Sequence, residues 1–240
     1  MNNLLNKVAL VTGAGSGIGK AISLSLAREG VKVILLGRNK DKLLATKNEI
    51  LSNDGVAEIL VCDLTNDSLV FNAVDNAYSI FNGLDILVNN AGMTLNCPFE
   101  STDIKDYDKI MALNSRAPFI LSQSAIKYLK NSNHAVIVNI ASVVAHQGYP
   151  NQSAYSASKH ALLGWTKSLA NEVYKDGIRV HAVSPGGVYT DMVAISRPDL
   201  SKDGMIMPSD VADSVLFLIK NRSNAVIDEI QIHRSNKAPF

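Results

Sequence analysis

The sequence predicts an α/β protein built around a doubly wound parallel sheet of about seven strands, with helices on both faces. Short apolar runs alternate with amphipathic stretches along the chain, and this alternation is typical of parallel strands joined by crossover helices. No proline- or serine-rich linker and no internal repeat interrupts it. We therefore expect residues 1–240 to form a single domain.

The apolar runs give the expected strands, because uninterrupted apolar residues suit a parallel strand that is covered on both faces. They lie near residues 7–12, 32–36, 56–62, 85–89, 135–141, 178–184 and 226–232. The helices expected between them include Ser115 to Lys130, Ser153 to Tyr174, and one that begins at a Ser209 cap. Ligands of such a sheet collect outside the carboxyl ends of its strands.

Composition argues against several classes of protein. The formal net charge of +1 disfavours a charge-driven nucleic-acid binder. No run approaches ~20 apolar residues and residues 1–7 lack a signal-peptide core, so we expect a cytoplasmic protein with no membrane partner. Cys62 and Cys97 are expected to be reduced thiols, and the spacing of His146, His160 and His181 predicts no metal.

A glycine-rich loop follows the first expected strand. The apolar run ending at Val11 leads into Thr12-Gly13-Ala14-Gly15-Ser16-Gly17-Ile18-Gly19, and Ile18, Ile22 and Leu26 then repeat at helical spacing. Glycine lacks the Cβ that would hold the backbone away from a pyrophosphate, and the free N–H groups of the following helix attract its charge. Strand, loop and helix together favour nucleotide binding over a mere tight turn.

Tyr155 and Lys159 form a second motif, because residues four apart meet on one face of a helix. A nearby positive charge favours the phenolate, so Lys159 should lower the pKa of Tyr155 toward the working pH. The pair then has the properties of a general acid/base. The same spacing also arises on solvated helices, and the accompanying motifs decide between the two interpretations.

The spacing Thr-Gly-x-x-x-Gly-x-Gly, combined with Tyr-x-x-x-Lys, resembles the short-chain dehydrogenase/reductase family. Further family motifs match Asn89-Asn90-Ala91-Gly92, Asn114, Ser142 and Pro185-Gly186, and the resemblance extends to about Thr190. It implies a single-domain Rossmann-type fold and hydride transfer between a nicotinamide cofactor and a small carbonyl or alcohol substrate. It also implies a homodimer or homotetramer assembled through the two helices expected at 115–130 and 153–174.

The resemblance gives four residues a catalytic role. Tyr155 would supply a proton to the carbonyl oxygen, Ser142 would hold that oxygen, and Lys159 would also bond the nicotinamide ribose. Asn114 would support a water-linked proton path from solvent to the lysine. Two alternatives stay open, because Ser142 could merely end a strand and Asn114 could satisfy a local backbone group.

The second expected strand ends at Gly37-Arg38, which predicts NADP as the cofactor, with NAD as the alternative. An arginine at this position can neutralise the 2′-phosphate of NADP, whereas an acid would repel it. The alternative is that Arg38 is a solvated loop residue without a binding role. By resemblance Asp63 bonds the adenine, although Asp63, Thr65 or Asp67 could instead cap the next helix. The other expected cofactor-binding residues are Gly13, Ser16, Gly17, Ile18, Gly19, Leu64, Asn90, Gly92, Tyr155, Lys159, Pro185, Gly186, Val188 and Thr190.

Residues 187–207 are expected to form a short substrate lid over an open, permissive pocket, which weakens assignment as a 3-oxoacyl-thioester reductase. Two other classes compete. A catalytically silent NADP(H)-sensing protein would not need the intact Ser142, Tyr155 and Lys159, and a methyltransferase gives the last two no task. The residues expected to line the substrate pocket are His146, Gln147, Tyr149, Tyr189 and Met192.

Overall fold

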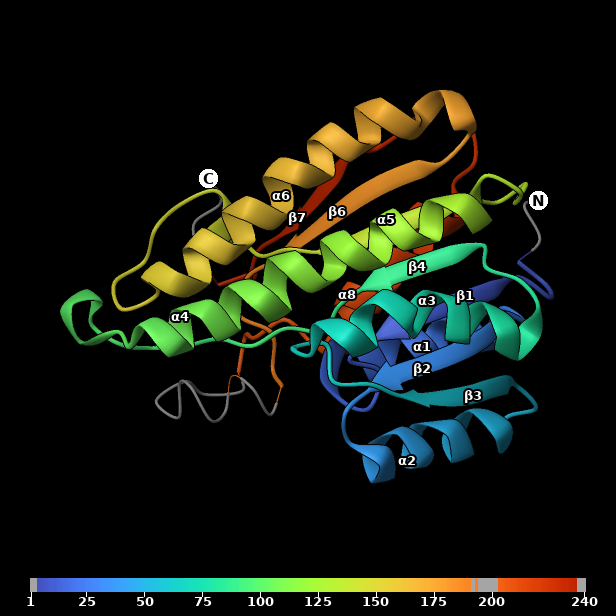
Figure 1. The fold of residues 1–240 in the computed structure, drawn as a ribbon, viewed down its shortest axis with the longest axis horizontal. Coiled ribbons are helices and arrows are strands. Elements are labelled where there is room, and N and C mark those ends of the chain that lie inside the picture. The colour runs from blue at the N-terminus through green and yellow to red at the C-terminus, as the bar shows by residue number, and fades with distance from the viewer. Residues whose placement is uncertain (1–3, 191–192, 194–202, 237–240) are drawn as a thin grey trace.

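A seven-stranded sheet forms the centre of the molecule, and every neighbouring pair of strands is parallel (Figure 1). The computed structural model describes residues 4–190, 193 and 203–236. Each strand begins within three residues of its predicted start, and the predicted fold class is confirmed. The strands are β1 (Val8–Thr12), β2 (Lys32–Gly37), β3 (Val56–Val61), β4 (Ile86–Asn89), β5 (Val136–Ile140), β6 (Arg179–Pro185) and β7 (Glu229–Ile232).

Helices cover both faces of this sheet. They are α1 (Gly17–Arg28), α2 (Lys40–Leu51), α3 (Asp67–Phe81), α4 (Ile104–Met111), α5 (Ala117–Leu129), α6 (Ser153–Val173) and α8 (Pro208–Lys220). Figure 1 looks onto the face covered by α3, α5 and α6, whereas α1, α2 and α8 pack on the other. None of the helices in the described residues is long and apolar enough to cross a membrane.

The strand order β3-β2-β1-β4-β5-β6-β7 reverses beside β1. Val11 of β1 is paired with Leu35 of β2 on one side and with Val88 of β4 on the other. Because the crossovers from β1 and β4 leave in opposite directions, a crevice opens at the carboxyl ends of these two strands. All residues of β1 and β4 are buried, as their apolar sequences predict.

The start of α8 corrects one prediction. The helix begins at Pro208, and Ser209 does not cap it. Instead, the carboxylate of Asp210 accepts a hydrogen bond of 2.8 Å from the N–H of Met207, the residue before the helix. An acid three residues into a helix can reach back in this way, which leaves no need for a serine cap.

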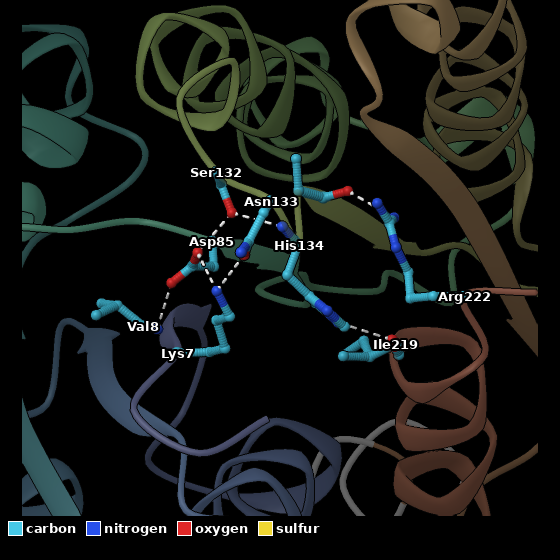
Figure 2. A network of polar contacts seen from close by, with 9 residues as sticks. Lys7, Val8, Asp85, Ser132, Asn133, His134, Ile219 and Arg222 are labelled. Carbon is cyan, nitrogen blue, oxygen red and sulfur yellow. Dashed lines mark hydrogen bonds and ion pairs between the residues drawn. The ribbon is translucent and has the colours of Figure 1, made fainter. Parts of the chain in front are cut away.

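Polar contacts close the amino edge of the sheet, opposite the crevice (Figure 2). Asp85, just before β4, accepts hydrogen bonds from the N–H of Val8 at 2.9 Å and from the hydroxyl of Ser132 at 2.5 Å. Nε2 of His134, just before β5, lies 3.0 Å from the carbonyl oxygen of Ile219 near the end of α8. These contacts join the amino ends of β1, β4 and β5 to one another and to α8. The crevice lies at the opposite edge of the sheet, at the carboxyl ends of the strands.

Candidate active site

A cavity of about 560 Å³ lies at the carboxyl edge of the sheet. Its wall is formed by the glycine loop after β1, by the ends of β2 to β6, and by the first turns of α6. The cavity therefore gathers motifs that are far apart in the sequence. The predicted residues that line it are Gly13, Ser16, Gly17, Ile18, Arg38, Asp63, Leu64, Asn90, Gly92, Ser142, Tyr155, Lys159, Pro185, Gly186, Val188 and Thr190.

The glycine loop is packed too closely for side chains at its key positions. A Cβ on Gly19 would collide with the carbonyl oxygen of Gly13 and with Nδ2 of Asn90. Gly13 itself has φ +66°, a conformation that glycine adopts without strain. The hydroxyl of Thr12 fixes the loop to the segment after the neighbouring strand β4, since its Oγ1 accepts hydrogen bonds of 2.9 Å from the N–H groups of Asn90 and Ala91. Gly19 thus supports the loop from behind the cavity wall.

Ser142 and Tyr155 come from different elements but lie close enough for the hydroxyl of Ser142 to affect the pKa of the phenol. Ser142 precedes the 3₁₀ turn Val143–Ala145 after β5, and Tyr155 lies in the first turn of α6. Burial raises the pKa of Tyr155 above its usual value, and the nearby hydroxyl of Ser142 offsets this only in part. The prediction of a lowered pKa is therefore wrong for this arrangement.

The position of Lys159 explains that difference. Its Nζ donates a hydrogen bond of 2.6 Å to the carbonyl oxygen of Ile140 and lies 5.9 Å from the centre of the Tyr155 ring. The hydrogen bonds of the described residues include none between this ammonium and the phenol oxygen, and the one that Nζ makes is to the backbone. Burial lowers the pKa of Lys159 to about 8, because a charged amine is poorly solvated there. The amine can change its protonation state close to neutral pH, while Tyr155 stays protonated.

Asn114 lies behind the cavity wall, in a π-helical turn (Ala112–Arg116) that joins α4 to α5. Its amide exchanges two hydrogen bonds of 2.8 Å with the backbone of Met93 and donates another of 3.0 Å to the hydroxyl of Ser158. The asparagine therefore does satisfy backbone groups, but those of a distant segment. A Cβ on Gly92 would lie 3.2 Å from Oδ1 of Asn114 and 3.8 Å from Nζ of Lys159, so both groups approach this glycine closely.

Positive charge gathers at the opposite end of the cavity. Asp63 accepts hydrogen bonds from the N–H of Thr65 at 2.9 Å and from its hydroxyl at 2.8 Å. These two bonds, followed by the charges of Arg38 and Lys109, lower the pKa of Asp63. Arg38, Lys42 and Lys109 all line the cavity, so the cations outnumber this one carboxylate.

The cap of α3 settles one alternative that the sequence left open. The helix is capped by Asn66, whose side chain accepts a hydrogen bond of 3.1 Å from the N–H of Ser68. Asp63 and Thr65 instead bond each other before the helix begins, and Asp67 is its first residue. Asp63 is therefore held at the cavity wall rather than at a helix end.

The sequence analysis missed two of the cationic residues of the cavity, Lys42 and Lys109. Lys109 precedes Leu113, another lining residue, by four positions, so helical spacing next to Asn114 could have shown that both face the cavity. No signal of this kind exists for Lys42. In the sequence it resembles Lys40, and only the fold shows that Lys42 lines the cavity and Lys40 does not.

Four of the five residues predicted to line a substrate pocket are described, and none of the four is part of the cavity wall. His146 contacts Glu229, Gln147 donates a hydrogen bond to the hydroxyl of Tyr149, and Tyr189 is 40% exposed. Met192 lies outside the described residues, as does much of the expected lid. The described base of that segment is closed by a parallel bridge between Val188 and Ile206 and by a hydrogen bond of 2.8 Å from the N–H of Tyr189 to the carbonyl oxygen of Ile206.

Comparison with known proteins identifies the class that this fold and site define. Residues 7–201 match the family model described as short chain dehydrogenase. The chain is 39% identical to a 3-oxoacyl-[acyl-carrier-protein] reductase of Rickettsia bellii, with 94% of each chain covered. This protein therefore belongs to the short-chain dehydrogenase family of oxidoreductases, as the sequence motifs predicted.

Solved structures agree with this membership. A short chain dehydrogenase from Burkholderia cenocepacia in complex with NADP is 33% identical, with a TM-score of 0.87 over 96% of this chain and 98% of the other. A metagenomic short-chain oxidoreductase in complex with NADP is 30% identical, with a TM-score of 0.86 over 98% of this chain and 100% of the other. The fold is thus shared along almost the whole chain.

Proposed function

We propose that this protein transfers hydride between NADP(H) and a small carbonyl or alcohol substrate, with Tyr155 as the general acid/base. One observation carries the proposal: Ser142, Tyr155 and Lys159 line the same cavity as the glycine loop and Arg38. A dinucleotide bound along this cavity would have its adenosine end near Arg38, its pyrophosphate at the glycine loop and its nicotinamide beside the proton donor Tyr155. A cofactor-binding protein without chemistry would not need that donor.

The residues present fit NADP. Gly13, Ser16, Gly17 and Ile18 line the cavity at the start of α1, where the free N–H groups of a helix N-terminus attract a pyrophosphate. Arg38, Lys42 and Lys109 supply positive charge for a 2′-phosphate, which carries about two negative charges near neutral pH. The two related structures with bound NADP support the same cofactor. NAD lacks this phosphate and would not use the positive charge gathered here.

The chain's own residues handle the carbonyl oxygen, while the bound nicotinamide would supply hydride to the carbon. Tyr155 is protonated at neutral pH because burial raises its pKa, so it can donate its proton to that oxygen. The hydroxyl of Ser142 would hold the same oxygen and stabilise its developing charge. Lys159, with a pKa of about 8, can take part in replacing the proton. Asn114 would support that path by fixing Met93 and Ser158.

A 3-oxoacyl-thioester reductase is the second candidate, because a relative of that name is 39% identical over 94% of both chains. The chemistry at Tyr155 would be the same, and only the substrate would differ. A third candidate is an NADP(H) sensor without turnover, which the intact Ser142, Tyr155 and Lys159 disfavour. Direct assay with acyl thioesters and with small ketones separates these three functions.

We further propose that residues 1–240 act as one domain with residues 187–207 as a short lid, and that the protein is a homodimer or homotetramer. The bridge between Val188 and Ile206 supports a lid whose base is fixed to the domain. Support for the assembly comes from the exposed Phe119 on α5, which contacts the partly buried Trp165 of α6; both are considered below with the test.

The test follows the loss of NADPH absorbance with a panel of small ketones, aldehydes, diketones and acyl thioesters. We expect turnover, and we expect Tyr155→Phe to lower kcat by roughly 10²- to 10⁴-fold while the Kd for NADPH stays unchanged. Tyr174→Phe is the matched control, because Tyr174 is exposed beyond the end of α6 and does not line the cavity. Wild-type rates in Tyr155→Phe would contradict the assignment of the acid. Tight NADPH binding with no turnover on the panel would favour the sensor.

A further inference from the structure

A cluster of polar side chains lies behind the active-site serine. Nε2 of His146 lies 2.6 Å from Oε1 of Glu229, and the hydroxyl of Ser184 donates a hydrogen bond of 2.5 Å to the same oxygen. The side-chain amide nitrogen of Gln231 lies 3.3 Å from Nε2 of His146. One carboxylate oxygen, that of Glu229, is therefore the centre of the cluster.

The cluster joins three separate elements. His146 belongs to the loop that follows β5, Ser184 to β6, and Glu229 to β7. The side chains of His146 and Glu229 are 30% and 18% exposed, and Ser184 is fully buried. A carboxylate shielded to this extent holds its donors more firmly than one on an open surface.

Both sides of Ser142 are connected to this cluster. Ser184 directly precedes Pro185, whose carbonyl oxygen accepts a hydrogen bond of 3.3 Å from the hydroxyl of Ser142. On the other side, Ser142 starts the turn that ends at His146, and the N–H of His146 bonds the carbonyl oxygen of Val143 at 3.1 Å. Glu229 thus holds the strand that faces Ser142 and the turn that carries it.

The same turn is fixed to α6 by Ser156. The hydroxyl of Ser156 donates to the carbonyl oxygens of Val144 at 2.9 Å and of Gln147 at 3.4 Å. Because Ser156 adjoins Tyr155, this contact sets the turn relative to the phenol. The turn is therefore held from two directions, by α6 through Ser156 and by β7 through Glu229.

We propose that Glu229 is a positioning residue for Ser142, acting through His146 and Ser184. This inference rests on the proposed function, since it concerns the geometry in which Ser142 and Tyr155 meet a carbonyl oxygen. Without the carboxylate, His146 and the buried hydroxyl of Ser184 lose their shared acceptor. The turn then loses its contact with β7, and the hydroxyl of Ser142 is held less firmly beside Tyr155. Small displacements of this kind lower catalytic rates more than binding.

The experiment compares Glu229→Ala, His146→Ala and the double variant with wild type, using the substrate found in the NADPH assay. We expect each single variant to lower kcat by roughly ten- to hundredfold, with the Kd for NADPH unchanged. The double variant should be no slower than the slower single variant, because both changes remove one shared contact. Glu229→Gln, which retains an acceptor oxygen, should recover part of the rate and guards against a folding defect in Glu229→Ala.

Glu29→Ala is the matched control. Glu29 pairs with Lys220 at 2.8 Å at the end of α1, away from the cavity, so its removal should leave kcat unchanged. Hydrogen exchange supplies a readout that needs no turnover. We expect the amides of residues 143–147 to exchange faster in Glu229→Ala than in wild type or Glu29→Ala.

The failure of this inference can be told apart from the failure of the proposed function. An inactive wild type would defeat the function, and unchanged exchange at 143–147 would separately defeat the positioning role. An active wild type with wild-type kcat in Glu229→Ala and His146→Ala would overturn the positioning role alone, even if exchange increased. Additive losses in the double variant would show that the two residues act independently, which also contradicts the proposal.

Discussion

Burial shifts the pKa values of Tyr155 and Lys159 in opposite directions and for the same reason. Both groups are less well solvated in their charged forms, so the pKa of the phenol rises and that of the amine falls to about 8. At neutral pH the phenol keeps its proton, and the amine is close to giving one up. These protonation states suit the proton donation that the proposed carbonyl reduction requires.

Substitution of Arg38 tests whether a single residue determines the preference for NADPH over NADH. We expect Arg38→Ala to raise the KM for NADPH by roughly ten- to hundredfold and to change the KM for NADH little, since a lost charge-assisted contact to the 2′-phosphate costs about 1.5–3 kcal/mol. Lys40→Ala is the matched control, because Lys40 lies two residues further on but does not line the cavity. An equal rise in the KM for NADPH and for NADH would show that Arg38 does not contact the 2′-phosphate.

The sequence predicts the position of a site residue better than it predicts that residue's contacts and pKa. Gly13, Ser142 and Arg38 were placed correctly at the cavity because each follows a strand, and strand ends can be read from apolar runs. The pKa of Tyr155 was predicted in the wrong direction, since spacing shows which residues share a helix face but not where an ammonium points. The contact between His146 and Glu229 joins distant segments and has no local signal.

At the scale of elements, the two edges of the sheet are built differently. The carboxyl edge opens into the cavity, whereas the amino edge is closed by the contacts of Asp85 and His134 (Figure 2). The neutral imidazole of His134 can donate its Nε2–H to the carbonyl oxygen of Ile219 and so holds α8 against β5. Burial is the main cause that lowers the pKa of His134, and the same is true of His181 in β6.

Acid should therefore weaken the fold through these two histidines. Their folded-state pKa values lie below the unfolded value of about 6.5, so their contribution is complete above about pH 6.5 and is lost as the pH falls below it. We expect the free energy of unfolding in urea to fall between pH 7 and pH 5, by at most about 1.4 kcal/mol per pH unit for each histidine.

The variant His134→Gln isolates one of these contributions. Glutamine keeps an N–H donor for the carbonyl oxygen of Ile219 but does not titrate, so the fall in stability with acid should become shallower. At pH 7.5, where the imidazole is neutral, the variant should unfold at a similar urea concentration. A wild-type stability that is flat from pH 7 to pH 5, or an unchanged slope in the variant, would contradict the argument.

The positions of the strands are easier to predict from the sequence than the hydrogen bonds that cap the helices. All seven strands begin within three residues of their predicted starts, because strands covered by helices on both faces, such as β1, β2, β4 and β5, are mainly apolar. The cap of α8 was misassigned because Ser209 and Asp210 are both good capping residues, and the sequence does not show which one reaches the N–H of Met207. The π-helical turn that holds Asn114 has no sequence signal of its own.

At the scale of the whole molecule, α4, α5 and α6 lie on the same side of the sheet (Figure 1), and these helices and the turn before α4 carry large exposed apolar side chains. Phe99, Ile104 and Phe119 are 83%, 68% and 47% exposed. Phe119 of α5 meets Trp165 of α6 edge to face, with ring centres 5.7 Å apart. The indole N–H of Trp165 is buried without a hydrogen-bond partner among the described residues.

Phe119→Glu tests whether this face joins two copies of the chain. In a two-fold interface each residue is buried twice, so losing two phenylalanines at about 2 kcal/mol each would weaken association by roughly a thousandfold. We expect sedimentation velocity to show a dimer becoming a monomer, or a tetramer becoming a dimer. Phe71→Glu on α3, with a similarly exposed ring, should leave the mass unchanged. An unchanged mass in Phe119→Glu would place the interface elsewhere, because a charge introduced on each of two facing rings could not remain buried there.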